Sequence, residues 1–236
     1  MSGLERVTNG CHRRRRSRLG RVARASLARR FDAEGCSVGL FAGSTYVDSL
    51  AEELDDAVAA AVDVGDSEAV VRGFETVRET LGSVDVLVFN ASAAAWDGTL
   101  DIDPDAFDRA LDTNVRGALH CVQAAVPDML DSDGGTVIFT GATTSVRGRE
   151  GAIGFSAAKF GARGMAESMA RELGPEGIHV AHVVIDGGIR PPEGAVENPE
   201  EYLDPDAIAD SYWRLVEQDR SAWTLELDLR PHVEEF

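Results

Sequence analysis

The chain has 236 residues, of which 44% are hydrophobic and 27% are charged. This composition is too apolar for a disordered protein, and no apolar run approaches the roughly 20 residues of a membrane-spanning helix. The formal net charge is −18, yet residues 1–30 carry +9 and residues 31–236 carry −27. A body this acidic repels nucleic acid and anionic lipid, so we expect neither as a partner.

Two explanations of the acidic charge stay open. One is an acidic face that binds a partner, and the other is a surface adapted to very high intracellular salt, where carboxylates keep a protein in solution. The acids are spread along the chain instead of gathered in one tail, which favours the second explanation. The chain also has a single lysine, Lys159, among its 23 lysines and arginines.

The cysteines and the N-terminal segment indicate a compartment. Three scattered cysteines, Cys11, Cys36 and Cys121, form neither a disulfide framework nor a four-ligand zinc site. The histidines lack metal-ligand spacing, so no metal site is predicted. Residues Met1–Arg30 contain no apolar stretch of the kind that a secretory signal needs. We therefore expect a soluble cytoplasmic protein.

Short apolar runs alternate along the chain with segments of helical pattern. Most of the runs are continuously apolar, which is typical of strands covered on both faces, whereas the last one alternates as an edge strand does. The predicted strands are Glu5–Thr8, Cys36–Phe41, Ala57–Asp63, Val84–Asn90, Thr136–Gly141, Val180–Asp186 and Leu225–Leu229. The predicted helices are Arg21–Glu34, Ser67–Leu81, Pro104–Leu111, Val115–Leu130, Phe155–Leu173 and Asp206–Gln218.

This alternation predicts the fold class. Strands separated by single helices form right-handed crossovers, and these build a parallel sheet with helices on both faces. The sequence therefore predicts one α/β domain over residues 1–236, with a doubly wound sheet of about seven strands in a three-layer α/β/α arrangement. Several boundaries carry start or stop residues: Ser67 and Asp103 as N-caps, and Gly35 and Gly82 as terminators.

In a doubly wound sheet, ligands bind outside the carboxyl ends of the strands, and the sequence places short motifs there. Together, in order and at the proper spacing, these motifs resemble the short-chain dehydrogenase/reductase family over roughly residues 35–230. The motifs are Asp63-Val64, Asn90-Ala91-Ser92, Thr113–Gly117 around Asn114, Phe155–Lys159, Gly174–Val180 and Asp186–Ile189.

The resemblance implies a Rossmann-like fold that binds NAD or NADP and acts on a carbonyl or alcohol. It implies catalytic roles for Asn114 and Lys159, the latter also contacting the nicotinamide ribose. It further implies a homodimer or homotetramer, in which the helix Phe155–Leu173 packs against a partner subunit. The other cofactor contacts that it implies in the body of the chain are Asp63, Val64, Asn90, Ala91, Gly187 and Ile189.

Two family residues are replaced. A tyrosine hydroxyl normally supplies the proton that the oxyanion needs after hydride transfer, but Phe155 occupies that position and has no proton to give. Ala142 occupies the position of the serine that holds the substrate oxygen. Proton delivery then falls to water or to the hydroxyl of Thr140 or Thr143. The chain is predicted to be a divergent oxidoreductase, and the alternative is a catalytically silent dinucleotide-binding or scaffolding protein.

The glycine-rich turn that approaches the pyrophosphate is also irregular. Gly10 and Leu19-Gly20 are the remaining cofactor-binding candidates, but Arg18 occupies the middle glycine position. Three explanations stay open for the arginine-rich segment around Arg13–Arg16: a basic phosphate-binding loop, a disordered insert, or a local reading-frame error in a GC-rich gene. We favour the reading-frame error, which the nucleotide sequence tests.

Each site residue also has a plainer interpretation. Lys159 could lie on the surface in solvent, Asn114 could only cap the following helix, and Asp63 could be an exposed acid at a strand end. The residues after the second strand, Ala42–Thr45, offer neither the acid typical of NAD binding nor the base typical of NADP binding. The sequence therefore leaves the choice between NAD and NADP open, and it does not indicate the substrate.

Overall fold

The structure is a computed structural model, and it describes residues 22–42, 46–191 and 196–234. The predicted strand Glu5–Thr8 and the candidates Gly10, Leu19 and Gly20 lie outside these residues. The prediction that residues 1–236 form one domain remains a prediction.

Six strands form the main layer, and every strand pair in it is parallel. Strand β1 (Val38–Ala42) pairs with β2 (Ala57–Ala61). The other four strands are hydrogen-bonded in the order β3-β4-β5-β8. They comprise β3 (Val86–Phe89), β4 (Gly135–Thr140), β5 (Ile178–Ile185) and β8 (Glu226–Leu229). The parallel α/β class is confirmed among the described residues, while the count of seven strands is not.

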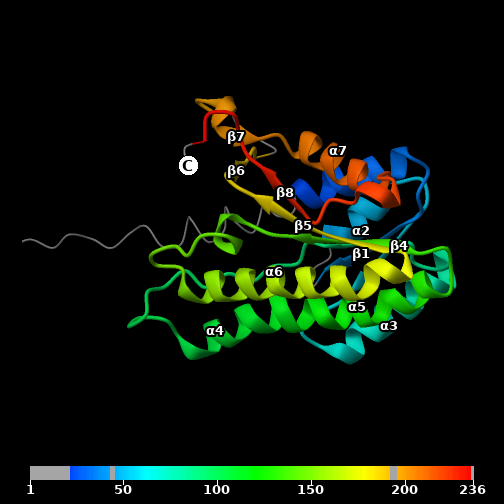
Figure 1. The fold of residues 1–236 in the computed structure, drawn as a ribbon, viewed down its shortest axis with the longest axis horizontal. Coiled ribbons are helices and arrows are strands. Elements are labelled where there is room, and N and C mark those ends of the chain that lie inside the picture. Colours follow the sequence, from blue (N-terminus) through cyan, green and yellow to red (C-terminus); the bar gives the residue numbers. More distant parts are fainter. Residues whose placement is uncertain (1–21, 43–45, 192–195, 235–236) are drawn as a thin grey trace, which may run out of the picture.

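Helices cover both faces of this layer (Figure 1). One face carries α3 (Ser67–Leu81), α5 (Gly117–Leu130) and α6 (Ile153–Leu173), whose apolar residues pack with β3, β4 and β5 into one core. On the other face, the helix over residues 22–33 and α7 (Pro205–Val216) form a second core with β5. Each helix lies where its apolar stripe meets the sheet, as amphipathic packing requires.

Strand burial follows position in the sheet. All eight residues of β5 are buried, in agreement with its continuously apolar sequence. Strand β8 lies at the edge and alternates exposed and half-buried residues, as predicted from its sequence. The strands differ from the predicted ranges by one to two residues at most ends, which is the usual uncertainty of such boundaries.

Some local predictions need correction. The N-cap of α3 is Asp66, whose carboxylate accepts the amides of Glu68 and Ala69, so the predicted cap at Ser67 is wrong by one residue. Asp103 caps α4 (Pro104–Leu111) as predicted, and Gly82 ends α3 with a φ of 98°. Three short elements were not predicted: helix α2 (Tyr46–Ala51) and the paired strands β6 (Gly188–Ile189) and β7 (Tyr202–Leu203).

The predicted helix start at Val115 is also wrong. A π-helical turn over Asp112–Arg116 joins α4 directly to α5, so the chain runs helically from Pro104 to Leu130. Single π turns inside helices are rare, and they often occur at functional sites. Asn114 lies in the middle of this turn and is 1% exposed. It is therefore inside a helix and does not cap one.

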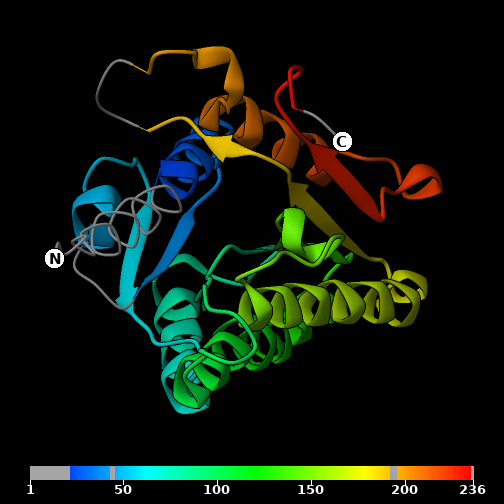
Figure 2. The same ribbon diagram turned by 90° about the vertical axis from the view of Figure 1, so that its left-hand side faces the viewer.

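The main layer is divided between β1 and β3. Within the described residues, each of these strands is paired on one side only, β1 with β2 and β3 with β4. A cavity of about 530 Å³ lies between them, lined by residues of both strands and by Leu27, Phe31 and Val77 from the helices. Figure 2 shows β1 and β2 standing apart from the strands of the larger group. The strand predicted at Glu5–Thr8 is outside the described residues. The cavity is therefore stated only for the residues that the structure describes.

Candidate functional site

Lys159 lies on α6, and its buried side chain reaches the carboxyl end of β4. Its side chain is 4% exposed, and Nζ donates a hydrogen bond of 2.8 Å to the carbonyl oxygen of Thr140. Burial lowers the pKa of Lys159 from its usual value to about 8, because an ammonium group loses hydration in the protein interior. The interpretation of Lys159 as a solvated surface residue is therefore wrong.

A row of contacts joins Lys159 to two aromatic rings and a second cation. Lys159 Nζ lies 5.7 Å from the ring centroid of Phe155, which stands one helical turn earlier on α6. The Phe155 ring lies 4.8 Å from Trp96, and the guanidinium of Arg149 lies 5.9 Å from the Trp96 ring. Phe155 is 9% exposed, so the residue at the tyrosine position of the family pattern is a buried packing residue. Cation–π contacts at these distances contribute about 0.5–2 kcal/mol each.

Asn114 approaches the same region from the π-helical turn. Its Nδ2 donates to the carbonyl oxygens of Ala93, at 2.7 Å, and Ala110, at 2.8 Å. Its Oδ1 is buried, and within the described residues it has no hydrogen-bond partner. Unsatisfied buried oxygens are uncommon, because each one costs roughly 1–3 kcal/mol. Asn114 thus holds the chain after β3 and leaves an acceptor for a further donor.

The hydroxyl groups after β4 are already engaged. Thr140 Oγ1 lies 2.9 Å from the hydroxyl of Tyr212 on α7, which is the opposite face from Lys159. Thr143 Oγ1 donates to Asp186 Oδ1 at 2.6 Å. A hydroxyl that is held in a hydrogen bond with protein is a poor proton donor to a substrate, so neither threonine is free for the role suggested by the sequence. Water remains as the proton source.

Asp186, which follows β5, binds two side chains from the segment after β4. It is 2% exposed and accepts hydrogen bonds from Thr143 and from Arg147 Nη2, at 2.9 Å. The next residue, Gly187, has a φ of 139°, and a side chain there would lie 2.8 Å from Pro231. The glycine therefore allows the chain to turn closely past Pro231, which the resemblance alone did not indicate.

The remaining predicted contacts lie at three strand ends. Asp63 Oδ1 accepts the amide of Gly65, and Val64 is buried with its carbonyl oxygen 3.2 Å from His120 Nδ1. Asn90 and Ala91 follow β3 and line the cavity between the strand groups. In β6, Ile189 is half-buried and faces Leu203 of β7 in register. The structure thus places all the described candidates at carboxyl ends of strands or on helices beside them.

Comparisons with known proteins agree with this geometry. The family model described as short chain dehydrogenase matches residues 24–197. The chain belongs to the short-chain dehydrogenase family. A 3α-hydroxysteroid dehydrogenase of Mediterraneibacter gnavus is 29% identical over 187 residues, covering 76% of this chain and 74% of that protein. A 3-oxoacyl-(acyl-carrier-protein) reductase of Staphylococcus aureus is 32% identical over 161 residues, covering 66% of this chain and 65% of that protein.

Solved structures of the family show the same fold. A short-chain dehydrogenase from Rhodopseudomonas palustris superimposes with a TM-score of 0.77 at 30% identity, covering 89% of this chain and 94% of that one. A metagenomic short-chain oxidoreductase in complex with NADP has a TM-score of 0.78 at 24% identity, covering 91% and 94% of the two chains, and shows the fold alone. The Rossmann-like fold and membership of an oxidoreductase family are therefore established.

Several residues of this short-chain dehydrogenase site were missed by sequence reasoning. Trp96, Ser145, His182 and Tyr212 all line or support it, yet they lie outside the motifs that carry the resemblance. His182 carried a signal, because a polar residue within a continuously apolar strand is uncommon in a core. In the described part of the chain, no helix is long and apolar enough to cross a bilayer, and no three metal-binding side chains cluster.

Proposed function

We propose that the protein is an NAD(P)-dependent oxidoreductase that interconverts a carbonyl and an alcohol on a small molecule. The observation that carries this proposal is the buried Lys159, held by the Thr140 carbonyl beside the ends of β4 and β5. An isolated buried ammonium is costly, and folds retain such groups mainly where they act on a ligand. The family's oxidoreductases support the same reaction class.

The described residues fit a dinucleotide. Lys159 contacts the end of β4, Asn114 with its unpaired Oδ1 holds the chain after the neighbouring strand β3, and Gly187 follows the other neighbouring strand, β5. The residues proposed to hold the cofactor are Asp63, Val64, Asn90, Ala91, Lys159, Gly187 and Ile189. When bound, NAD or NADP supplies the hydride acceptor or donor at its nicotinamide ring. Gly10, Leu19 and Gly20 remain candidates outside the described residues.

In this proposal, Lys159 performs the electrostatic part of the chemistry. Its positive charge, buried where the dielectric constant is low, stabilises the negative oxygen that forms when a carbonyl is reduced. Phe155 and Trp96 present an apolar wall beside it, which orients a substrate without hydrogen-bonding it. The proton comes from water, because the hydroxyls of Thr140 and Thr143 already bond to Tyr212 and Asp186.

A second function has its own supporting observation. Phe155 and Ala142 remove both hydroxyls of the family's proton-transfer machinery, and the two flanking threonines do not replace them. A catalytically silent dinucleotide-binding or scaffolding protein would keep the fold, the buried Lys159 and subunit assembly without turnover. We place this function second, because scaffolding alone does not need a buried lysine.

Calorimetric titration with NAD, NADP and their reduced forms tests the proposal, at high salt to match the acidic surface. A panel of ketones, aldehydes and alcohols then follows, with the variant Phe155→Tyr beside the wild type. We expect binding of one dinucleotide and a rise in reductase rate of about 10²–10⁴-fold in Phe155→Tyr, the usual contribution of a general acid. Binding without turnover in either form would select the silent protein, and no binding at all would refute both functions.

A further inference from the structure

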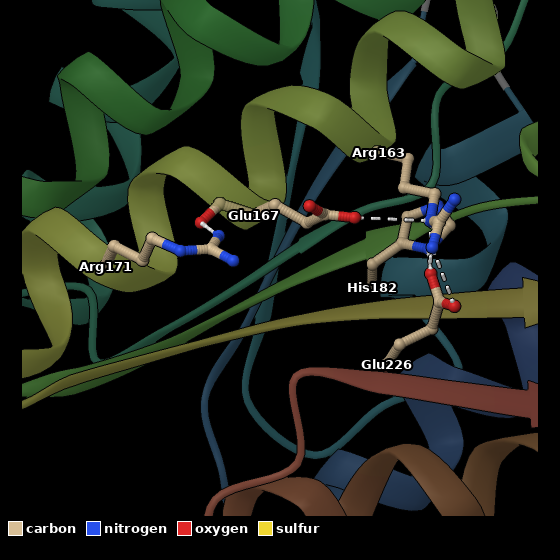
Figure 3. A network of polar contacts seen from close by, with 5 residues as sticks. All are labelled: Arg163, Glu167, Arg171, His182 and Glu226. Carbon is tan, nitrogen blue, oxygen red and sulfur yellow. Dashed lines mark hydrogen bonds and ion pairs between the residues drawn. The ribbon is translucent and has the colours of Figure 1, made fainter.

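Arg149 is an arginine whose guanidinium group has no polar partner in the described chain. Most described arginines form an ion pair with a carboxylate. Figure 3 shows one of them, Arg163, which contacts Glu167 and Glu226. Arg149 forms neither an ion pair nor a side-chain hydrogen bond with a described residue, and its guanidinium lies 5.9 Å from the Trp96 ring. Its N–H donors are therefore open to a ligand.

The start of α6 holds both members of this cation–aromatic pair. The backbone amide of Arg149 donates to Ser156 Oγ, in the first turns of α6, at 3.3 Å. The amide of Ile153, the first residue of α6, donates to the carbonyl oxygen of Asp97 at 3.4 Å, and Asp97 follows Trp96. One helix start thus anchors the loop after β4 and the segment after β3. Arg149 and Trp96 are therefore brought together before a ligand arrives, which lowers the entropic cost of binding.

A hollow of about 580 Å³ lies beside Arg149. Two loops and the first turns of α6 line it: residues 98–101 after β3, residues 148–151 after β4, Ile153 and Ser156. Its volume is within the range of sites that bind small molecules. Ser156 follows Phe155, whose ring contacts both Trp96 and Lys159. The hollow therefore adjoins the candidate site, at the end of the row that is farther from Lys159.

The lining of the hollow combines this cation with exposed apolar side chains. Leu100 is 96% exposed and Ile153 is 37% exposed, so both offer surface to an apolar ligand. Asp101 and Glu150 also line the hollow, but neither forms an ion pair with Arg149. Their carboxylates repel a free anion, and an exposed ion pair alone contributes little. An anion attached to an apolar body gains from both kinds of contact, because it also covers apolar surface.

We propose that the substrate is an amphipathic acid and that Arg149 binds its carboxylate. The inference rests on the proposed function, because it names the substrate class of that site. The reacting oxygen lies at Lys159, the apolar body follows the two aromatic rings, and the carboxylate lies at Arg149. Lys159 likewise bonds only to the Thr140 carbonyl and has no carboxylate partner among the described residues. The planar fork of an arginine matches a carboxylate with two parallel hydrogen bonds, which makes Arg149 specific for this group.

Binding of model compounds tests this assignment without cofactor or turnover. The probes are octanoate, its uncharged analogue octanamide, and acetate, titrated by ligand-observed NMR at the lowest salt concentration that keeps the protein folded. We expect octanoate to bind about tenfold more tightly than octanamide, because the amide loses a charge-assisted hydrogen bond. Acetate should bind at least about tenfold more weakly than octanoate, because it has almost no apolar surface to bury. Octanamide or acetate binding as tightly as octanoate would overturn the proposal.

Two matched variants locate the bound carboxylate. Arg149→Gln removes the guanidinium from an exposed side chain, so the fold should persist. Arg214→Gln is the control: Arg214 is also exposed and without an ion pair or hydrogen bond to a described side chain, but it lies on α7 and lines neither cavity. We expect Arg149→Gln to abolish the preference for octanoate over octanamide and Arg214→Gln to keep it. Equal losses in both variants, or no loss in Arg149→Gln, would overturn the assignment.

Turnover separates this inference from the proposed function. In an active form, oxo acids of increasing chain length are compared with their methyl esters. We expect kcat/KM to be about tenfold higher for the preferred acid than for its ester, through KM and with kcat unchanged, and Arg149→Gln to remove the difference. Turnover without this preference would overturn the role of Arg149 and leave the proposed function standing. Octanoate binding that depends on Arg149, without turnover of any substrate, would refute the proposed function and leave the carboxylate site standing.

Discussion

The two strand groups of the main layer differ in how completely they are built. In the β3-β4-β5-β8 group, β5 is buried along its whole length, and its polar residues, His179 and His182, contact groups of neighbouring elements. In the β1-β2 group, both strands consist largely of half-buried residues, and β1 borders the cavity that separates the groups. Among the described residues, the β5 side is therefore packed on both faces, whereas the β1 side borders a cavity.

The two strand groups obtain their stability from different interactions. Apolar burial on both faces stabilises the β5 side, whereas the β1 edge has backbone groups without a strand partner among the described residues. The proposed electrostatic role of Lys159 depends on the first kind of surroundings, because a buried charge keeps its effect only where water is excluded. The comparison is tested by changes that act on one group of strands and spare the other.

Lys159→Met should change the pH dependence of stability more than any other substitution proposed below. Because the pKa of Lys159 is lowered to about 8 in the folded chain and is near 10.5 when unfolded, the unfolded state binds more protons between these values. The wild type should therefore gain unfolding free energy as pH rises from 8 to 10.5, on the order of 3 kcal/mol. The methionine variant should lack this gain. Urea denaturation at pH 7, 8, 9 and 10.5 measures the difference between the two proteins.

Comparison of the variant with the wild type cancels the other groups that titrate at high pH. Cys121 is one of them, because burial raises the pKa of its thiol to about 12. Parallel stability curves for Lys159→Met and wild type would mean that the ammonium is solvated, which contradicts its burial. The same result would remove the observation on which the proposed function depends.

A smaller loss is expected from Asp186→Ala. The change leaves the Thr143 hydroxyl without its acceptor and Arg147 without its ion pair. The Arg147 side chain is 46% exposed, so its charge returns to water and the cost stays at about 2 kcal/mol instead of the larger value for fully buried pairs. Thermal unfolding of the variant measures this cost. The surface change Asp210→Ala is the control, and an equal loss there would contradict a specific role for Asp186.

Most of the parallel α/β fold could be predicted, because its strands and helices have distinct periods. Helix α3 and helix α4 have the predicted bounds, and the apolar run of β5 correctly indicates burial on both faces. The π-helical turn at Asn114 could not be predicted, since its residues have no pattern that separates a π turn from an ordinary one. The short β6-β7 pair depends on contacts between residues 14 positions apart, which local patterns do not encode.

The candidate site also contains residues that the sequence predicts and residues that it does not. Lys159 and Asn114 were found through the family's spacing, and the structure buries both. The hydrogen bonds of the Thr140 and Thr143 hydroxyls could not be predicted, because their partners, Tyr212 and Asp186, are distant in sequence. His182 stood out only as a polar residue in an apolar strand, and nothing in the sequence indicates its pairing with Glu226.

Hydrogen exchange measures the local stability of the two strand groups. Amides of β5 lie between two paired strands under helices on both faces, whereas amides of β1 and β2 have one paired neighbour among the described residues. We expect β5 to exchange at least about tenfold more slowly than β1 and β2, since local opening near an open edge needs less free energy. Mass spectrometry of peptic fragments measures the rates. Equal protection would show that the β1 edge is covered in solution.

The smallest expected difference is between two glycine substitutions. A Cβ at Gly39 would lie 2.8 Å from Val77, but both residues line the cavity beside β1, so Val77 has room to move. A Cβ at Gly141 would lie 2.4 Å from the His182 ring, which Glu226 holds in place. Gly141→Ala should therefore cost about 1 kcal/mol by overpacking, and Gly39→Ala less than half of that. Chemical denaturation compares them, and a larger cost at Gly39 would mean that the β1 side is packed as tightly as the β5 side.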